Sequence, residues 1–143
     1  TRGALQPQCW NNGPRWWLAE VANEAELRAH APDFEAIAAL CRASGATGLA
    51  AFAETGRAQE RLAVRAWCPA DGIPEDPVTG SANGSIGALL HAQGRAAPGS
   101  SYIASQGREL GRDGRIEVGL REDGVWIGGS SVTVIDGMIR FDE

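Results

Sequence analysis

The 143-residue chain contains no lysine, since its thirteen basic residues are all arginines. This absence excludes a P-loop lysine, a lysine Schiff base and covalently held pyridoxal phosphate within the chain. Only two histidines and three cysteines are present, and the cysteines form no Cys-x-x-Cys pair. We therefore expect neither a metal site built from His and Cys nor a disulfide framework.

The sequence also has no excess of positive charge and no long apolar run. The net charge of -5 gives no basic footprint for nucleic acid or an anionic membrane. No apolar stretch approaches the roughly 20 residues of a membrane-spanning helix, and residues 1–7 do not read as a signal peptide. Unpaired cysteines are typical of a reducing compartment. We therefore expect a cytoplasmic protein without a nucleic-acid or membrane partner.

The composition is that of a folded domain. A hydrophobic fraction of 43% and five tryptophans are enough to build a core. We expect a single domain over residues 1–143, with residues 1–14 as an irregular lead-in because Pro7, Asn11-Asn12-Gly13 and Pro14 interrupt it.

Periodicity predicts the elements of the first half of the chain. Apolar residues at helical spacing predict a helix over 33–43, capped by Asp33 and ended by Gly45. A shorter helical turn is expected over 24–29. Branched and aromatic residues predict a strand over 15–21, and a short apolar run flanked by glycines predicts one over 48–53. Alternation predicts a strand over 61–66 with one buried face.

The second half of the chain combines one helix with further strands. The helix is predicted over Ser81–Gln93, and Gly80, Gly84, Gly87 and Ala88 give it a small face that another group can approach closely. Strands are predicted over 115–120, 125–127, 131–135 and 138–141, with Asp136-Gly137 as a hairpin turn. Strands therefore dominate, with helices embedded among them.

The most informative segment is Gly72–Ala82, with the sequence GIPEDPVTGSA. It places Glu75 and Asp76 before a rigid proline and a Thr-Gly-Ser step that begins the second helix. The first N–H groups of a helix have no intrahelical acceptor, and the helix dipole makes that end partly positive. Small residues there let an anion approach the backbone. The segment predicts a pocket for a small acid, faced by Asp76, with Glu75 as a solvated neighbour.

More ordinary interpretations of these residues stay open. Asp before Pro often starts a solvated turn. Thr79 and Ser81 are also typical helix caps, a role compatible with an anion site because both use the same end of the helix. His91 lies late in the helix, where a cation suits the dipole, and we do not expect it to be catalytic.

The same segment, preceded by Arg65-Ala66-Trp67-Cys68-Pro69, resembles the signature of the second half of phenazine-biosynthesis PhzF-like proteins. These are relatives of diaminopimelate epimerase in fold. Residues 12–16, 106–112 and 128–129 agree as well, so that the resemblance covers the chain from Asn12 to its end. The run EDPVTGSA is a specific motif.

The resemblance implies an α+β fold of two similar halves, each a curled, mostly antiparallel β-sheet or barrel around a central helix. It implies isomerisation of a small carboxylated metabolite in a biosynthetic process, in the cleft between the halves, without a metal or organic cofactor. By position, Asp76 would hold the substrate, and Gly80 and Ser81 would bind its carboxylate. Thr79 and Asn83 complete the implied substrate-binding set.

Two departures from the family pattern matter. A histidine commonly follows Gly-Ser-Ala in the family, whereas this chain has Asn83, which can form hydrogen bonds but cannot titrate near neutral pH. The family's general acid/base glutamate and a Gly-His pair belong to the first half. Glu54 lies in a different context, so we predict no catalytic residue within this chain.

Two hypotheses follow. The chain is either the C-terminal domain of a PhzF-like isomerase, with its catalytic glutamate on an N-terminal half encoded elsewhere, or a non-catalytic binding and assembly module. In the second case two copies pair through the face that the missing half would cover, giving a homo-oligomer. Trp16, Trp17 and Trp67 are candidates for that face. A truncated gene product is a third interpretation.

Overall fold

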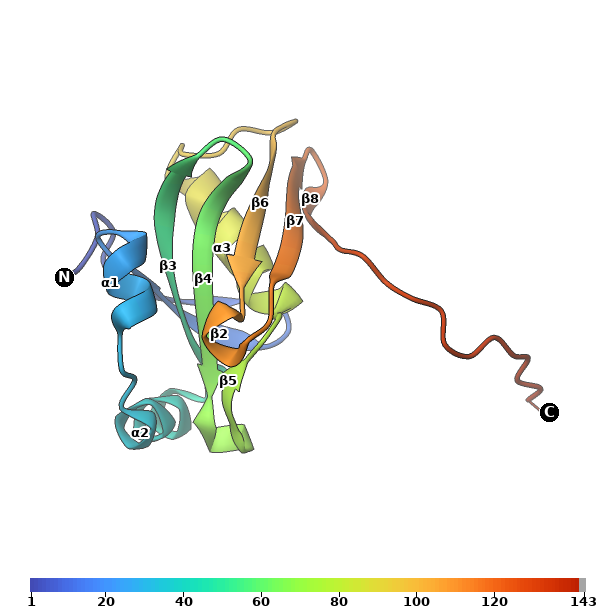
Figure 1. Ribbon diagram of the computed structural model, residues 1–143, viewed down its shortest axis with the longest axis horizontal. Helices are drawn as coiled ribbons and strands as arrows, with labels where there is room; N and C mark the ends of the chain where they lie inside the picture. Colours follow the sequence, from blue (N-terminus) through green and yellow to red (C-terminus); the bar gives the residue numbers. More distant parts are fainter. Residues whose placement is uncertain (142–143) are drawn as a thin grey trace.

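The protein folds as a curled mixed sheet wrapped around one helix (Figure 1). The computed structural model describes residues 1–141. Its sheet has eight strands: β1 (Gln8–Asn11), β2 (Arg15–Glu20), β3 (Gly48–Arg57), β4 (Glu60–Cys68), β5 (Ile73–Asp76), β6 (Ser101–Gln106), β7 (Gly114–Arg121) and β8 (Gly124–Gly128). Their order is β1-β2-β3-β4-β6-β7-β8, with β5 paired to β4 beside this path. Only β2–β3 and β4–β6 run parallel, in agreement with the predicted α+β class.

Three helices cover the two faces of this sheet. Helix α3 (Gly80–Ala92) lies inside the curl, while α1 (Glu24–Ala29) and α2 (Phe34–Ser44) lie outside it (Figure 1). The local signals of α2 act as predicted, since Asp33 accepts from the Ala36 N–H and Gly45 adopts a left-handed conformation. Nearly every residue of α3 between Ala82 and Leu90 is buried, as expected for a helix enclosed by a sheet.

The alternation of side chains along the central strands divides the core into two clusters. Phe52, Leu62 and Val64 point inward and pack with Ile86 and Leu90 of α3. The intervening residues point outward toward α1 and α2, in a cluster that contains Leu27, Ile37, Ala51, Ala63 and Trp67. Because helices cover both of its faces, β4 is buried on both sides. The prediction of a strand with one buried face was therefore wrong.

The N-terminal segment is more regular than the expected irregular lead-in of residues 1–14. Residues 8–11 form β1, which pairs antiparallel with β2 and places Trp10 opposite Trp16. The Asn-Asn-Gly-Pro sequence makes the tight turn between these strands, where the Asn11 side chain accepts from the Gly13 N–H and Gly13 has a φ of 111°. The turn residues therefore join two strands and do not make the whole of residues 1–14 irregular.

The segment between β4 and α3 is also more regular than the sequence indicated. Residues 69–71 form a 3₁₀ turn and β5 pairs antiparallel with the end of β4, with Asp76 opposite Ala66. The segment Gly72–Ala82 is therefore attached, through β5, to the central strand β4.

The C-terminal segment differs most from expectation. Residues 129–141 form neither of the two strands predicted at 131–135 and 138–141, and the segment runs away from the sheet (Figure 1). A strand requires a neighbour for its backbone hydrogen bonds, and no described strand lies beside this segment. Its large apolar side chains are 78% to 88% exposed: Val132, Val134, Ile135, Met138, Ile139 and Phe141. In residues 1–141 no helix has the length and apolar character needed to cross a membrane.

Candidate active site

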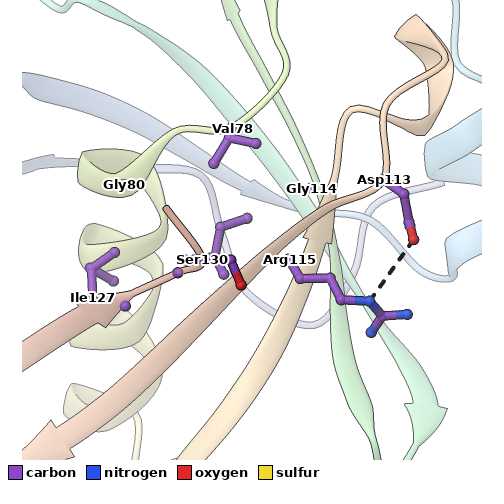
Figure 2. A pocket seen from close by; sticks show the side chains of 10 residues that line it. Val78, Gly80, Asp113, Gly114, Arg115, Ile127 and Ser130 are labelled. Atoms are coloured by element: carbon purple, nitrogen blue, oxygen red, sulfur yellow. Dashed lines mark ion pairs between the residues drawn. The ribbon is translucent and has the colours of Figure 1, made fainter. Parts of the chain in front are cut away.

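Two hollows flank the start of α3. The larger, with a volume of about 560 Å³, is lined by Val78, Gly80, residues 113–116 at the start of β7 and residues 127–130 at and beyond the end of β8 (Figure 2). The second, of about 390 Å³, is lined by Asn12, Ser81, Gly84 and other residues of α3 and β8. Gly80 and Ile127 border both hollows. The first turn of α3 is thus reachable from two sides.

The backbone at this helix start is left without hydrogen-bond acceptors. Thr79 occupies the N-cap position, but its side chain does not cap the helix. Within residues 1–141, no hydrogen bond engages the N–H groups of Gly80, Ser81 or Ala82. Unpartnered amides at the positive end of a helix form an anion-binding arrangement.

Ser81 adds a hydroxyl donor to this arrangement. Its Oγ accepts a hydrogen bond from the indole N–H of Trp16 at 3.0 Å, and its carbonyl accepts from the Asn12 side chain at 2.8 Å. Because the indole can only donate, the Ser81 hydroxyl proton stays available, and no described residue accepts it. Ser81 is therefore not the helix cap that the sequence also allowed.

Asp76 is held by a buried polar cluster at the same end of α3. The Thr79 hydroxyl donates to Asp76 Oδ2 at 2.6 Å. Gln106, at the end of β6, donates to the Asp76 carbonyl at 2.7 Å and to Thr79 Oγ1 at 2.8 Å. Asn83 donates to Gln106 Oε1 at 3.0 Å and to the Thr79 carbonyl at 2.9 Å. Three of the predicted site residues, Asp76, Thr79 and Asn83, are thus joined through Gln106.

Glu75, expected to be a solvated neighbour, instead belongs to a buried ion pair. Its carboxylate accepts two hydrogen bonds from Arg65 at 2.8 Å and 2.9 Å, and the two side chains are 7% and 5% exposed. Arg65 also donates to the His30 carbonyl at the end of α1 at 2.6 Å. Glu75 thereby fastens β5 to β4 and α1, one residue before Asp76, because a buried carboxylate needs an opposite charge.

Comparison with known proteins agrees with this architecture. A family model described as "Phenazine biosynthesis-like protein" (PhzC-PhzF) matches residues 1–137. The chain belongs to the PhzC/PhzF family. This confirms the resemblance found in the EDPVTGSA segment.

Relatives in this family carry isomerase or epimerase names. An uncharacterized isomerase of Deinococcus radiodurans is 40% identical over 115 residues, which are 75% of this chain and 37% of the relative. An uncharacterized isomerase of Schizosaccharomyces pombe is 30% identical over 139 residues, which are 92% of this chain and 74% of the relative.

Solved structures show the same fold. The structure of a predicted epimerase from Pseudomonas aeruginosa superimposes with a TM-score of 0.59 at 30% identity, covering 82% of this chain and 39% of the other. A PhzF-family structure from Bacillus anthracis gives a TM-score of 0.64 at 23% identity, covering 80% and 41%. The chain thus spans less than half the length of these two proteins and of the Deinococcus relative.

The two buried cysteines of this PhzC/PhzF chain, Cys41 and Cys68, are unsuited to act as nucleophiles. Burial, together with the nearby carboxylate of Asp76, raises the pKa of the Cys68 thiol to about 12. Burial also raises the pKa of the Cys41 thiol. A nucleophilic cysteine acts as a thiolate, so neither sulfur is activated near neutral pH. Within residues 1–141, no group of His, Cys, Asp and Glu side chains is arranged to hold a metal ion.

Sequence reasoning did not assign three residues to this site: Asn12, Trp16 and Gln106. Trp16, and with it Trp67, was a candidate for a pairing face, but both are buried, at 2% and 1% exposure, and cannot form one. Trp17 is partly buried and donates to Ser44 Oγ at 2.9 Å. A signal for Gln106 existed, since a glutamine followed by glycine ends a strand of otherwise small and apolar residues.

Proposed function

We propose that this chain is the substrate-binding half of a PhzF-like, cofactor-independent isomerase acting on a small carboxylated metabolite. The observation that carries the proposal is the free donor set at the start of α3, beside Asp76. The N–H groups of Gly80, Ser81 and Ala82 and the proton of the Ser81 hydroxyl all lack an acceptor in the described chain. A substrate carboxylate can accept from several of these donors at once.

Asp76 supplies a second point of attachment. Its Oδ2 is occupied by Thr79, whereas no described residue donates to Oδ1. Oδ1 can therefore accept from an amino or hydroxyl group of the substrate. Thr79 and Asn83 are buried, at 6% and 1% exposure, so that they support the site from within while Gly80, Ser81 and Asp76 contact the ligand.

Proton transfer at carbon requires an acid/base group within hydrogen-bond reach of the carbon-bound proton. The proposal assigns Asp76 to holding the substrate, so the proton transfer falls to another carboxylate. Glu54, on β3, is bound instead by Arg61 at 3.0 Å and by Arg95 at 3.1 Å. We assign the catalytic glutamate to an N-terminal half, consistent with the chain spanning 37% of its Deinococcus relative.

A second candidate function is a binding or assembly module that pairs two copies of this chain. The exposed apolar residues between 132 and 141 favour it, because soluble monomers rarely expose such a surface. The end strands of the sheet order, β1 and β8, each pair with one neighbour within residues 1–141 and could accept a strand from a partner. Both functions require a partner, either the N-terminal half or a second copy.

Proton exchange into substrate distinguishes the two candidates. The purified chain is incubated in D2O with a panel of small amino and hydroxy acids, and the loss of each Cα–H signal is followed by NMR, alone and after co-expression with the polypeptide encoded directly upstream. We expect exchange only in the presence of the upstream polypeptide, and its loss in Asp76→Asn. Enzyme-like exchange by the chain alone, unaffected by Asp76→Asn, would overturn the proposal. Light scattering of the chain alone tests the assembly module, which requires a dimer.

A further inference from the structure

We infer that Gln106 is the positioning residue of this site. It directs the proton of the Thr79 hydroxyl toward Asp76 and thereby leaves one carboxylate oxygen available for a ligand. The inference rests on the proposed function for the role of Asp76, but the contacts that carry it are those of this chain alone. Gln106 comes from β6, far from the EDPVTGSA segment in sequence, and is completely buried.

The side-chain amide of Gln106 uses its whole hydrogen-bonding capacity on this site. A glutamine amide has two N–H donors and an oxygen with two lone pairs. Nε2 donates to the Asp76 carbonyl and to Thr79 Oγ1, at 2.7 Å and 2.8 Å. Oε1 accepts from the Thr79 N–H and from Asn83 Nδ2, at 3.2 Å and 3.0 Å. With four partners on three residues, the orientation of the amide is determined by the network.

This orientation decides where the Thr79 proton goes. The Thr79 oxygen already accepts from Gln106, and its single proton lies on the 2.6 Å bond to Asp76 Oδ2. Asp76 Oδ2 is therefore an acceptor, and the plane of the carboxylate is set by a chain that runs from Gln106 through Thr79. Asp76 Oδ1, to which no described residue donates a hydrogen bond, is the oxygen left for a ligand.

Gln106 also occupies the backbone amide that precedes the helix. It accepts from the N–H of Thr79, whereas the next three amides, those of Gly80, Ser81 and Ala82, are the first of α3 and stay without acceptors in the described chain. The anion-binding part of the helix start therefore begins at Gly80, directly beside the residue that Gln106 holds.

A zwitterionic probe can distinguish a role of Gln106 in positioning Asp76 from a role in folding alone. Glycine offers a carboxylate to the Gly80–Ala82 amides and an ammonium group to Asp76, whereas acetate offers only the carboxylate. Both probes are titrated into the 143-residue chain, and the Gly80 and Ser81 amide signals are followed by NMR. We expect the wild type to bind glycine about tenfold more tightly than acetate, as one charge-assisted hydrogen bond allows.

Gln106→Met is the principal variant. It should abolish the preference for glycine over acetate and accelerate hydrogen exchange of the Thr79 amide about tenfold or more relative to Leu89, in the interior of α3. The matched control is Ser105→Ala, which also truncates a fully buried polar side chain on β6 but one that contacts Arg28 and the Leu62 carbonyl instead. The control should keep both the preference and the protection of the Thr79 amide.

Thr79→Val provides a second route if Gln106→Met does not fold. It retains the backbone groups that bind Gln106 but removes the hydroxyl that reaches Asp76, so the preference for glycine should fall while acetate binding persists. Unchanged preference in both variants, or acceleration of exchange spread evenly over β6 and α3, would overturn the role of Gln106. If wild type binds neither probe, the proposed carboxylate site fails, and exchange at the Thr79 amide still decides whether Gln106 holds this loop.

Discussion

The start of α3 and the segment over residues 129–141 depart from the usual distribution of side chains in opposite directions. At the start of α3, the polar side chains of Thr79, Asn83 and Gln106 are buried and bonded to one another. In the C-terminal segment, Val134 and Ile135 are 87% and 88% exposed. Satisfied buried polar networks make one end of a fold rigid, whereas large exposed apolar patches are rare on soluble monomers. The comparison separates a polar cluster that the chain satisfies by itself from apolar side chains that the described residues leave exposed.

If the contrast between these two regions holds, the buried polar side chains near the start of α3 stabilise the fold. Arg65→Met tests this, and we expect it to cause the largest loss in the free energy of unfolding. The substitution leaves the Glu75 carboxylate buried without its cation and removes a donor from the His30 carbonyl. Breaking a buried ion pair from one side costs about 3–5 kcal/mol. Urea denaturation should show a loss of this size.

The control for this prediction is the double variant Arg65→Met with Glu75→Leu. Removing both charges should restore most of the lost free energy of unfolding, because no unpaired charge then remains buried. A single variant within about 1 kcal/mol of wild type would mean that the pair is weaker than its burial indicates.

Asn83→Asp tests the same region with a nearly isosteric change. An ionised carboxylate cannot donate to Gln106 Oε1 or to the Thr79 carbonyl, both of which now accept from Asn83 Nδ2. Each oxygen keeps one donor, the Thr79 N–H for Gln106 Oε1 and the Asn83 N–H for the Thr79 carbonyl, but loses its hydrogen bond from Asn83 Nδ2 and faces a carboxylate oxygen instead. This loss should cost about 1–3 kcal/mol in the free energy of unfolding at neutral pH. Asn11→Asp, at an exposed turn residue, serves as the control. An equal loss of stability in the two variants would contradict the prediction that the buried hydrogen bonds of Asn83 stabilise the start of α3.

The loss of stability in acid tests whether the ion pairs of Glu24, on α1, also stabilise the fold. Arg57 and Arg28 lower the pKa of Glu24 to about 2, against the opposing effect of partial burial. Because the folded pKa lies below the unfolded value of 4.5, Glu24 stabilises the fold above pH 4.5, and this contribution is lost as the pH falls toward 2. Glu24→Gln should therefore flatten the decline of stability between pH 5 and 2. An unchanged slope would show that the ion pairs of Glu24 contribute little in solution.

Removal of residues 130–143 should have the smallest effect on stability. The large apolar side chains of this segment make no buried contact in the described chain, so the free energy of unfolding should change by less than about 0.5 kcal/mol. Self-association, followed by light scattering, should decrease. The full-length control, Val134→Asp with Ile139→Asp, should reproduce this decrease. A large loss of stability would show that the segment packs on the sheet.

Local signals in the sequence predicted the elements that depend on neighbouring residues. Asp33 and Gly45 define the two ends of α2 because capping acts within a single helical turn. Asp76 and Thr79 lie three residues apart, so the loop that joins them to α3 was also visible in the sequence.

The remaining features depend on contacts between distant residues. Gln106 reaches Asp76 from 30 positions away, and Trp16 reaches Ser81 from 65 positions away. Glu75 was expected in solvent because nothing near it in sequence signals that Arg65 would be buried beside it. The strands predicted within residues 131–141 were wrong, because a strand forms only when another strand lies beside it, whatever the pattern of its side chains.

The carboxylate site proposed at the uncapped start of α3 would couple the stability of this chain to the concentration of its ligand. Because the Thr79 hydroxyl is committed to Asp76 rather than to the helix end, an anion that accepts from the free amides supplies what a capping side chain otherwise would. A ligand that binds only the folded state raises the free energy of unfolding by about 2.7 kcal/mol at a hundredfold excess over its Kd. For a domain of this size that is a rise of several degrees in melting temperature, on the order of 3 °C per kcal/mol. Thermal melts across a library of metabolic acids can therefore rank substrate candidates before any reaction is assayed.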